Sequence, residues 1–596
     1  MVDYHPPCED LKFVLNDVLG VGRLDHPGFD KLDDDLLSSI IGAFGEFAAK
    51  EIGSCNAEGD RAGASLSPEG VVAAPGFARA YRGFVEGGWP ALTCREEDGG
   101  EGMPGILYSI MEEMLAGANL SFSMAPLISP GAYRVIKNHG TPELRAAFLP
   151  KIVSGEWTTA MSLTEPHCGS ALGLLRTRAE PDGASGYRIT GTKMFNSWAD
   201  HDMSENIVHL VLARLAGAPE GVKGISLFVV PKYLVGADGA LGARNAFSVG
   251  SLEKKLGVHA SPTCATNFDG ATGYLLGEPH RGVAAMFVIM NHMRLASGVC
   301  AVGVADAAYR NALAYTRERL AGRSVTGPKY PQLPGDPIIV HPDVRRMLMT
   351  QRAVVEGGRA LCFWASLTLD LTEAHPDAEQ RAADDALVSL LTPVIKAFLT
   401  DKAFECADLA LQCFGGHGFI SDNGAEQYLR DSRMLRLGEG TSGIQAMDFI
   451  GRKVVGDDAR ALGLFFDMIR AGLDGLDAAH PDLAAVRAGV RAALDSAVRL
   501  TDEQLPRWTD DPETMAAVSL DYLHLVGYLA LGFMWVKMAA TASEGLSGNP
   551  ADSTFRKNKM RTARFYVAYL LPEVEALATR IRAGASATMA IPEDAF

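Results

Sequence analysis

Apolar residues recur at helical spacing over the first part of the chain. Asp33, Asp34 and Asp35 lead into the amphipathic run LLSSIIGAFGEFAAKEIG, and Pro142 opens a second run, PELRAAFLPKIVSG. Acidic residues and proline at these positions are typical of helix starts. We therefore predict a helical domain over residues 1–157.

The pattern changes at about Thr158, where short alternating and β-branched runs begin. The runs YRITGTKMFN, NIVHLVLARL and GISLFVV are separated by Gly, Pro and Asp, which favour turns between strands. This pattern predicts a compact β domain over residues 158–280.

Long helical segments return after the β domain. We predict a second helical domain over residues 281–458, interrupted by a Pro/Gly-rich loop from Gly322 to Asp336 that reads as an insertion between two helices. Residues 459–596 form a further helical segment with an apolar stripe, which we expect to be structural or interfacial and without a catalytic residue. The stripe consists of Leu483, Val486, Val490, Leu494 and Val498.

Composition narrows the classes of protein. A chain of 596 residues is longer than single cores usually become, so several domains are expected. With 47% hydrophobic and 21% charged residues it is globular in composition. The net charge of -17 argues against a nucleic-acid partner, because no basic surface stands ready for phosphates.

The cysteines and the N-terminus indicate the compartment. Nine cysteines, an odd number without a C-x-x-C pair, predict a reducing compartment and no disulfide framework. The first residues contain no basic segment followed by an apolar one, so we expect a cytoplasmic protein. The most apolar window, Leu525–Val536, is about half of the roughly 20 residues that span a bilayer, and we expect a buried helix and no transmembrane segment.

Four separated stretches carry candidate chemistry. They are MSLTEPHCGS (161–170), GTKMFNS (191–197), QCFGGHGF (412–419) and LGEGTSGIQ (437–445). Each has a structural interpretation: strand turns for the first two, a helix C-cap for the third, and for the last a capping box formed by Ser442 and Gln445. The last stretch also places the carboxylate of Glu439 between two glycines, which permit sharp turns and close approach by a ligand.

The order of these motifs decides between the interpretations. L-T-E-P-x-x-G-S, G-T-K-M-F, Q-x-x-G-G-x-G, R-D and E-G-T follow one another through helical, β and helical domains, and over residues 40–455 the chain resembles the acyl-CoA dehydrogenase family. The N-terminal YHPPCEDLKFVL and the last helical segment are similar to the longer subgroup that includes bacterial long-chain-type enzymes and the 3-methylthiopropanoyl-CoA dehydrogenases. The resemblance implies an α+β fold with an N-terminal helical domain, a middle β-barrel-like domain, a C-terminal helical bundle and an additional helical domain.

The resemblance also implies an activity. It predicts FAD-dependent α,β-dehydrogenation of an acyl-CoA to a trans-2-enoyl-CoA, with Glu439 as the base and with electrons passed to an electron-transferring flavoprotein. The expected assembly is a homodimer or homotetramer. By the same resemblance, the cofactor-binding residues are Leu163, Thr164, Ser170, Phe195, Ser197, Arg319, Gln412, Gly415, Gly416 and Thr441. The substrate-side residues are Gly438, Gly440 and Arg294, with Arg294 bracing the catalytic loop, and no metal is implied.

Two alternatives remain open at this point. An acyl-CoA oxidase shares these residues and differs mainly in whether oxygen reaches the reduced flavin. A non-catalytic flavin- or acyl-thioester-binding scaffold is the other alternative, against which the presence of Glu439 argues.

The chain departs from the family pattern beside the base, where Gly438 stands in place of the usual tyrosine. The missing ring leaves a space that another side chain, water or the substrate must fill. Asn196, if it points inward, adds a hydrogen-bonding group there. We therefore expect an acyl group that is bulky or polar near Cα to Cγ, in preference to a straight saturated chain. The alternative is that Trp198 fills the space and ordinary acyl-CoAs are used.

Overall fold

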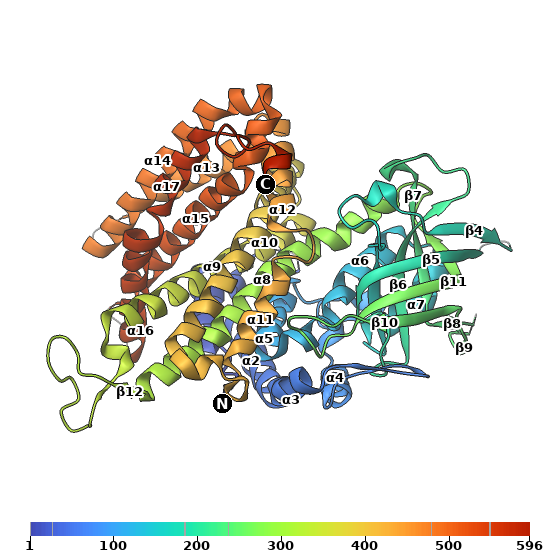
Figure 1. The fold of residues 1–596 in the computed structure, drawn as a ribbon, viewed down its shortest axis with the longest axis horizontal. Helices are drawn as coiled ribbons and strands as arrows, with labels where there is room; N and C mark the ends of the chain where they lie inside the picture. The colour runs from blue at the N-terminus through green and yellow to red at the C-terminus, as the bar shows by residue number, and fades with distance from the viewer. Residues whose placement is uncertain (1, 27, 184–185, 237, 478–479, 547–549) are drawn as a thin grey trace. The chain divides into compact units, whose positions relative to one another are not determined.

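The computed structural model describes residues 2–596 except 27, 184–185, 237, 478–479 and 547–549 (Figure 1). It divides into two compact units. Residues 1–45 and 297–596 form the first, which we call the helical unit, and residues 46–296 form the second, which we call the mixed unit. The domain boundaries expected from the sequence remain predictions, since compactness alone does not test them.

The mixed unit begins with helices. They are α3 (Asn56–Ala62), α4 (Phe77–Glu86), α5 (Ile106–Ser123), α6 (Ser129–His139) and α7 (Pro142–Val153). Every residue of α5 is buried, so this helix forms the centre of the helical layer. Helix α7 begins at Pro142, as the sequence predicts, and the side chain of Thr141 caps it by accepting from the Leu144 N–H.

The strands of the mixed unit form a seven-stranded sheet that closes on itself. Its order is β10, β11, β5, β4, β6, β3, and β7 pairs with both β11 and β6, which completes a ring of five strands. Closure of this kind leaves the five ring strands paired on both sides, while β3 and β10 pair on one side only. The strands are β3 (Trp157–Ser162), β4 (Arg178–Asp182), β5 (Gly186–Ser197), β6 (Asn206–Leu215), β7 (Ile225–Pro231), β10 (Phe247–Leu252) and β11 (Thr263–Leu276). Short pairs lie outside it, β1 (Ser65–Ser67) with β2 (Gly70–Val72) and β8 (Tyr233–Val235) with β9 (Leu241–Arg244).

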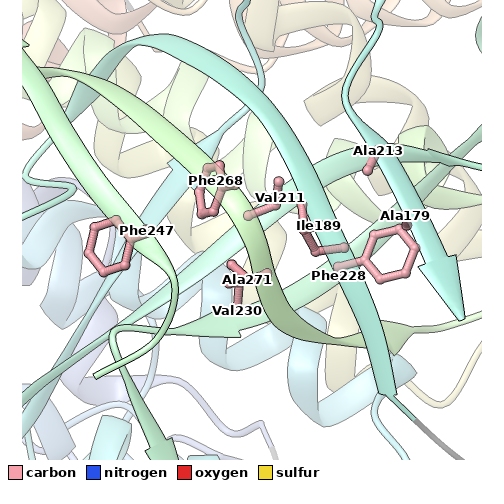
Figure 2. Packing of buried hydrophobic residues seen from close by; sticks show 9 residues of the cluster. All are labelled: Ala179, Ile189, Val211, Ala213, Phe228, Val230, Phe247, Phe268 and Ala271. Atoms are coloured by element: carbon pink, nitrogen blue, oxygen red, sulfur yellow. The ribbon is translucent and has the colours of Figure 1, made fainter. Parts of the chain in front are cut away.

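Apolar side chains from several strands of the ring fill its interior (Figure 2). Phe247 and Phe268 pack at one part of this cluster and Phe228 at another, all at least 95% buried. The remaining members are Ala179, Ile189, Val211, Ala213, Val230 and Ala271. The alternation of these positions with exposed ones along β5 and β11 is the period-two pattern that the sequence shows.

The helical unit contains the second helical domain expected from the sequence. Helix α8 (Gly282–Glu318) begins in the mixed unit and ends here, followed by α9 (Pro342–Ala374), α10 (Ala378–Phe414), α11 (Ala425–Leu435) and α12 (Ser442–Met447). The predicted insertion lies between α8 and α9 and is closed by pairing of β12 (Leu320–Ala321) with β13 (Asp336–Pro337). The buried carboxylate of Asp336 accepts N–H bonds from Ser324 and Tyr330 and so organises the loop.

The last part of the chain is helical, as the sequence predicts. It comprises α13 (Arg460–Asp474), α14 (Pro481–Asp510), α15 (Pro512–Glu544), α16 (Pro550–Phe565) and α17 (Glu573–Ala583). Helix α15 packs against α14 and α17 on one side and against α9, α10 and α12 on another (Figure 1). Of the predicted stripe on α14, four residues are buried and Val498 is half-buried.

Two of the described helices, α8 and α15, are long and apolar enough to cross a membrane, but their most apolar windows are 72% and 83% buried inside the protein. Both are therefore core helices, as we expected for Leu525–Val536 of α15.

All nine cysteines are free, and only Cys8 is not fully buried. The N-terminal part of the helical unit consists of α1 (Cys8–Lys12) and most of α2 (Asp34–Phe47). The predicted α+β class is confirmed.

A histidine lies within the apolar interior of the β domain. His209, on β6, is fully buried, with its ring 4.9 Å from that of Phe247 and 5.9 Å from that of Phe268. Neither ring nitrogen has a hydrogen-bond partner among the described residues. Burial lowers the pKa of His209 to about 4, so the folded protein holds this imidazole neutral.

We predict that His209→Leu makes the protein less sensitive to acid. The folded pKa lies below the value of about 6.5 in an unfolded chain, so the stability contributed by the neutral ring is complete above that pH and is lost as the pH falls towards 4. Between pH 7.5 and 5 the free energy of unfolding should fall by ~1–2 kcal/mol less in the variant than in wild type. Urea unfolding at both pH values measures this. Exposed His5→Gln is the control, and equal acid slopes in wild type and His209→Leu would contradict the prediction.

Candidate active site

Two of the sequence motifs meet in the mixed unit. The N–H of Met194, on β5, donates to the carbonyl of Thr164 at 2.9 Å, and the ammonium of Lys193 donates to the carbonyl of Leu163 at 3.0 Å. These bonds hold the segment 163–170 beside the end of β5. The structure thus brings half-buried Leu163, Thr164 and Ser197 together with the segment that ends in exposed Ser170.

A β-bulge directs Phe195 out of the sheet. Thr266 of β11 pairs with Lys193 and Cys264 pairs with Asn196, so two residues of β5 oppose one of β11. Phe195 takes a left-handed φ of 57°, and its side chain is 63% exposed. An aromatic residue that is both strained and exposed contributes little to folding, which favours a role in ligand contact.

A buried ion pair links the same two motifs. The Lys193 ammonium lies 3.0 Å from Glu165 Oε1, and the side-chain exposures are 0% and 3%. Burial lowers the pKa of Lys193 to about 8, although Glu165 opposes that shift. Glu165 also lies near His167 and Cys168, with candidate metal-binding atoms within 4.8 Å of one another. Both Glu165 oxygens already accept hydrogen bonds from Thr177 and Arg176, so the cluster is explained as the fastening of a loop.

Asn196 and Trp198 are occupied within the mixed unit. The buried Asn196 amide lies 3.2 Å from the hydroxyls of Ser162 and Thr266. With the amide oxygen towards these hydroxyls, its nitrogen donates to the main-chain carbonyls of Met161 and Met194. Trp198 is 1% exposed, stacks on Phe77 and donates to the carbonyl of Ser121 at 3.3 Å. The expectation that Asn196 offers its amide to an acyl chain is therefore wrong, because the sheet itself satisfies the amide. The alternative that Trp198 swings into the space beside Gly438 would cost this packing.

Glu439 lies in the helical unit on a turn that is fixed through its backbone. Its φ is 55°, a left-handed value rare for a residue with a side chain, and that of Gly440 is 91°. The side-chain amide of Gln445 donates to the Glu439 carbonyl at 2.9 Å, and the Lys396 ammonium donates to the Gly440 carbonyl. The side chain of Glu439 therefore extends from a main chain that is held at two consecutive carbonyls.

The helix that follows is capped differently from the prediction. The N-cap of α12 is Thr441, whose hydroxyl accepts from the Ile444 N–H, and the predicted cap Ser442 is the first helical residue. Ser442 instead donates to the carboxylate of Asp401, and Gln445 is directed to Glu439. Both side chains of the expected capping box hold the Glu439 turn in place.

The space beside Gly438 contains Met434. A Cβ built on Gly438 would lie 3.3 Å from the Met434 Sδ atom, at the end of a flexible side chain on α11. Met434 thus takes part of the volume in which the family pattern has a tyrosine ring. A thioether fills an irregular space and adapts more readily than an aromatic ring.

The remaining predicted cofactor residues of the helical unit lie at the ends of two helices. Exposed Gln412, Gly415 and Gly416 lie where α10 ends, with Gly415 at a φ of 58°, and exposed Arg319 follows α8. Tyr315 of α8 joins these ends by stacking on Phe414 and bonding to His417 at 2.9 Å. The end of α10, at Phe414, is ~20 Å along the helix from Asp401, which contacts the Glu439 turn. These four residues form a group separate from Glu439, Gly440 and exposed Thr441.

Arg294, the remaining predicted residue, lies on α8 in the mixed unit. It is 7% exposed, and its guanidinium lies 5.8 Å from the centre of the Phe287 ring. The proposed bracing of the catalytic loop by Arg294 stays a prediction. Sequence reasoning did not identify the supporting roles of four buried polar side chains, namely Lys193 in the mixed unit and Lys396, Asp401 and Gln445 in the helical unit. Charged residues inside apolar helical runs, as in PVIKAFLTDKAF, are the signal that points to Lys396 and Asp401.

Comparison with known proteins covers nearly the whole chain. It matches the family descriptions "Acyl-CoA dehydrogenase, N-terminal domain" at residues 39–156, "Acyl-CoA dehydrogenase, middle domain" at 160–271 and "Acyl-CoA dehydrogenase, C-terminal domain" at 280–454. Residues 465–592 match "Acetyl-CoA dehydrogenase C-terminal like".

Individual relatives extend this similarity. The chain is 39% identical over 582 residues to a 3-methylmercaptopropionyl-CoA dehydrogenase of Ruegeria pomeroyi, covering 97% of this chain and 98% of that protein. It is 33% identical over 590 residues to a broad-specificity linear acyl-CoA dehydrogenase of Mycobacterium tuberculosis, covering 96% of each chain. Its fold is similar to an acyl-CoA dehydrogenase of Bacillus anthracis solved with FAD, with a TM-score of 0.73, 21% identity and coverage of 92% and 88%.

We predict that Phe195→Ala weakens FAD binding without destabilising the protein. Aromatic contacts contribute about 0.5–1.5 kcal/mol, so the Kd of the apoprotein for FAD should rise about two- to tenfold. The thermal midpoint of the apoprotein should change little because the ring is exposed. Tyr569→Ala removes a ring of similar exposure, 65%, from the last helical segment and should leave the Kd unchanged. An unchanged Kd in Phe195→Ala would remove this ring from the cofactor site.

Proposed function

This chain belongs to the acyl-CoA dehydrogenase family, and from that premise we propose that it oxidises an acyl-CoA thioester to a trans-2-enoyl-CoA with Glu439 as the base. It is an oxidoreductase of the CH–CH class, and FAD is the cofactor of the family. The observation that carries the proposal is the left-handed turn at Glu439, fixed at two consecutive carbonyls.

The turn suits a general base for a thioester. Gly438 and Gly440 leave both sides of the Glu439 Cα without side chains, so a flat acyl thioester can approach the carboxylate closely. Glu439 takes the proton from Cα, and we assign its main-chain N–H to the thioester carbonyl, on which negative charge develops. Donors aimed at such a developing enolate are usually the largest contribution to catalysis of this kind.

The residues present fit FAD. FAD, when bound, supplies the acceptor for the hydride that leaves Cβ. The mixed unit offers the exposed ring of Phe195 in a bulge beside the hydroxyls of Thr164 and Ser197, which is the chemistry that a flat ring with polar edges requires. We assign Leu163, Thr164 and Ser197 to the flavin ring, with Phe195 beside it, Ser170 to the pyrophosphate and Thr441 to the cofactor on the side of the base. Arg319, Gln412, Gly415 and Gly416, at the ends of two helices, are assigned to the ADP half across a subunit interface.

The electron acceptor is proposed to be an electron-transferring flavoprotein, and the enzyme a cytoplasmic homodimer or homotetramer. An acyl-CoA oxidase is the alternative. Peroxide formed in proportion to substrate under air would indicate the oxidase, whereas turnover that needs an added electron acceptor would indicate the dehydrogenase. A purified protein without bound flavin, or one whose flavin no acyl-CoA bleaches, would favour a non-catalytic scaffold.

The proposed substrate carries a thioether or a branch near Cα to Cγ. The support is the identity of 39% to a protein named for a methylmercapto substrate, against 33% to one named for linear chains. Gly438 supports the same class, because the nearest atom to a Cβ at this position is the thioether sulfur of Met434, an adaptable side chain in place of an aromatic ring. Straight acyl-CoAs are the second candidate, since the side chains of Asn196 and Trp198 are engaged within the mixed unit.

We predict that Glu439→Gln retains FAD but no longer lets acyl-CoA reduce it. The amide has the same shape and cannot accept the proton, and loss of a general base costs about 10² to 10⁴ in rate. Anaerobic stopped-flow bleaching of the flavin measures this step directly. Glu513→Gln, at an exposed position in the first turn of α15, should behave as wild type. Near-normal bleaching in Glu439→Gln would exclude the proposed role.

We predict that Gly438→Tyr changes substrate ranking. The new ring must displace Met434 and fill the space beside the base, so kcat/KM should fall for branched and thioether acyl-CoAs relative to butanoyl- and octanoyl-CoA. A shift of roughly tenfold is expected, because one methylene in a pocket changes selectivity by about that factor. Met434→Leu, which keeps the volume, is the matched control. If straight chains are the best wild-type substrates and Gly438→Tyr leaves the ranking unchanged, the enlarged pocket is wrong.

A further inference from the structure

The buried carboxylate of Asp401 stands behind the Glu439 turn. Asp401, on α10, is 4% exposed and accepts on Oδ1 from Arg436 Nε at 2.6 Å and from Ser442 Oγ at 2.9 Å. Arg436 and Ser442 flank the segment 437–441, so one carboxylate holds both ends of the turn. Its other oxygen, Oδ2, faces His524 Nε2 at 3.0 Å.

His524 comes from the last helical segment, on α15. Its ring meets that of Phe398 edge to face, with centroids 5.5 Å apart, and Phe398 packs in the same manner on Tyr528. The imidazole is therefore fixed in orientation by its neighbours. Because the carboxylate can only accept, the Nε2 atom carries the proton and donates to Asp401.

Close packing of α15 on α10 brings His524 within hydrogen-bonding distance of Asp401. A Cβ built on Gly527, one turn after His524, would lie 2.5 Å from Cγ of Phe398, so only glycine fits at that position. A glycine inside a helix costs about 1 kcal/mol relative to alanine. The close approach that brings His524 to Asp401 compensates for that cost.

The partners of Asp401 keep it ionised. Burial alone would raise the pKa of this carboxyl, but the His524 hydrogen bond, the Arg436 charge and the Ser442 hydroxyl together lower it. Without His524, the Oδ2 atom would be a buried acceptor that has lost its donor. A buried group in that state turns towards water or towards a neighbouring donor, and either change moves Arg436 and Ser442.

We propose that His524 is a positioning residue for the reaction, through which the last helical segment holds Asp401 and thereby the backbone of the Glu439 turn. The inference rests on the proposed role of Glu439. The last helical segment thus contributes to catalysis, although we expect it to contain no catalytic residue.

The test compares three variants at His524. His524→Gln retains a donor near the Nε2 position, His524→Asn carries the same amide one methylene shorter, and His524→Leu removes the donor. We expect kcat to fall roughly ten- to hundredfold in Asn and Leu with KM within twofold, because small misplacements of a base carry costs of this order. His524→Gln should restore kcat to within threefold of wild type.

A second measurement does not depend on turnover. Hydrogen exchange of peptides covering residues 437–445 should accelerate at least fivefold in His524→Asn, with FAD or without it, while a peptide covering β6 is unchanged. Tyr522→Phe is the matched control. Tyr522 lies on α15, as His524 does, and the change removes a buried hydrogen bond to Thr501 of α14 without touching Asp401. It should leave both kcat and the exchange of residues 437–445 at the wild-type level.

The outcomes separate this inference from the proposed function. Wild-type kcat and exchange in His524→Asn, an equal loss of kcat in Tyr522→Phe, or failure of His524→Gln to restore kcat would each overturn the positioning role. If His524→Leu is insoluble, the comparison of His524→Gln with His524→Asn decides whether the positioning role holds. Normal flavin bleaching in Glu439→Gln would instead overturn the proposed function, whatever the His524 variants do.

Discussion

One backbone conformation, the left-handed φ of Glu439, imposes conditions on much of the helical unit. For a residue with a side chain this conformation costs about 1–2 kcal/mol, and it persists only where the surroundings hold it. Lys396 and Gln445 bind the carbonyls of the turn, and Asp401 binds the residues at its ends. Buried polar side chains on α10 and α12, which a purely apolar bundle would not contain, are explained by this requirement.

The mixed unit uses a related device. Phe195 is also left-handed and is placed by a bulge in β5, while the Glu165–Lys193 ion pair joins two stretches that are 28 residues apart in sequence. The Glu439 turn and the Phe195 bulge therefore each consist of an irregular backbone held by buried charges. The side chains that we assign to the ligands lie on these segments, and the buried charges hold the segments in position.

Local rules predicted much of the fold and less of the site. Helical and alternating apolar periods identify the order of helical and β segments, since burial of one face depends on neighbours in sequence. The capping box at Ser442 and Gln445 was misplaced because Asp401, 41 residues away, recruits the Ser442 hydroxyl. Asn196 was misjudged for the same reason, since its partner Thr266 lies 70 residues along the chain. A single sequence gives the donor and acceptor types but not which distant group each one meets.

The longest of these connections is a network of buried ion pairs that joins the N-terminal segment to the last helices. Asp10, in the N-terminal YHPPCEDLKFVL, is buried with Arg359 of α9 and with Lys559 of α16, which are 349 and 549 residues away. Burial opposes ionisation of Asp10, but the charges of Lys559 and Arg359 hold its pKa well below the usual range. Removing one partner of a buried ion pair typically costs 3–5 kcal/mol, because the other charge is left uncompensated. Lys559 has Glu356 as a second partner at 2.9 Å, so the network involves α9 as well. The N-terminal segment and the last helices are therefore connected by a buried network of charges within the helical unit.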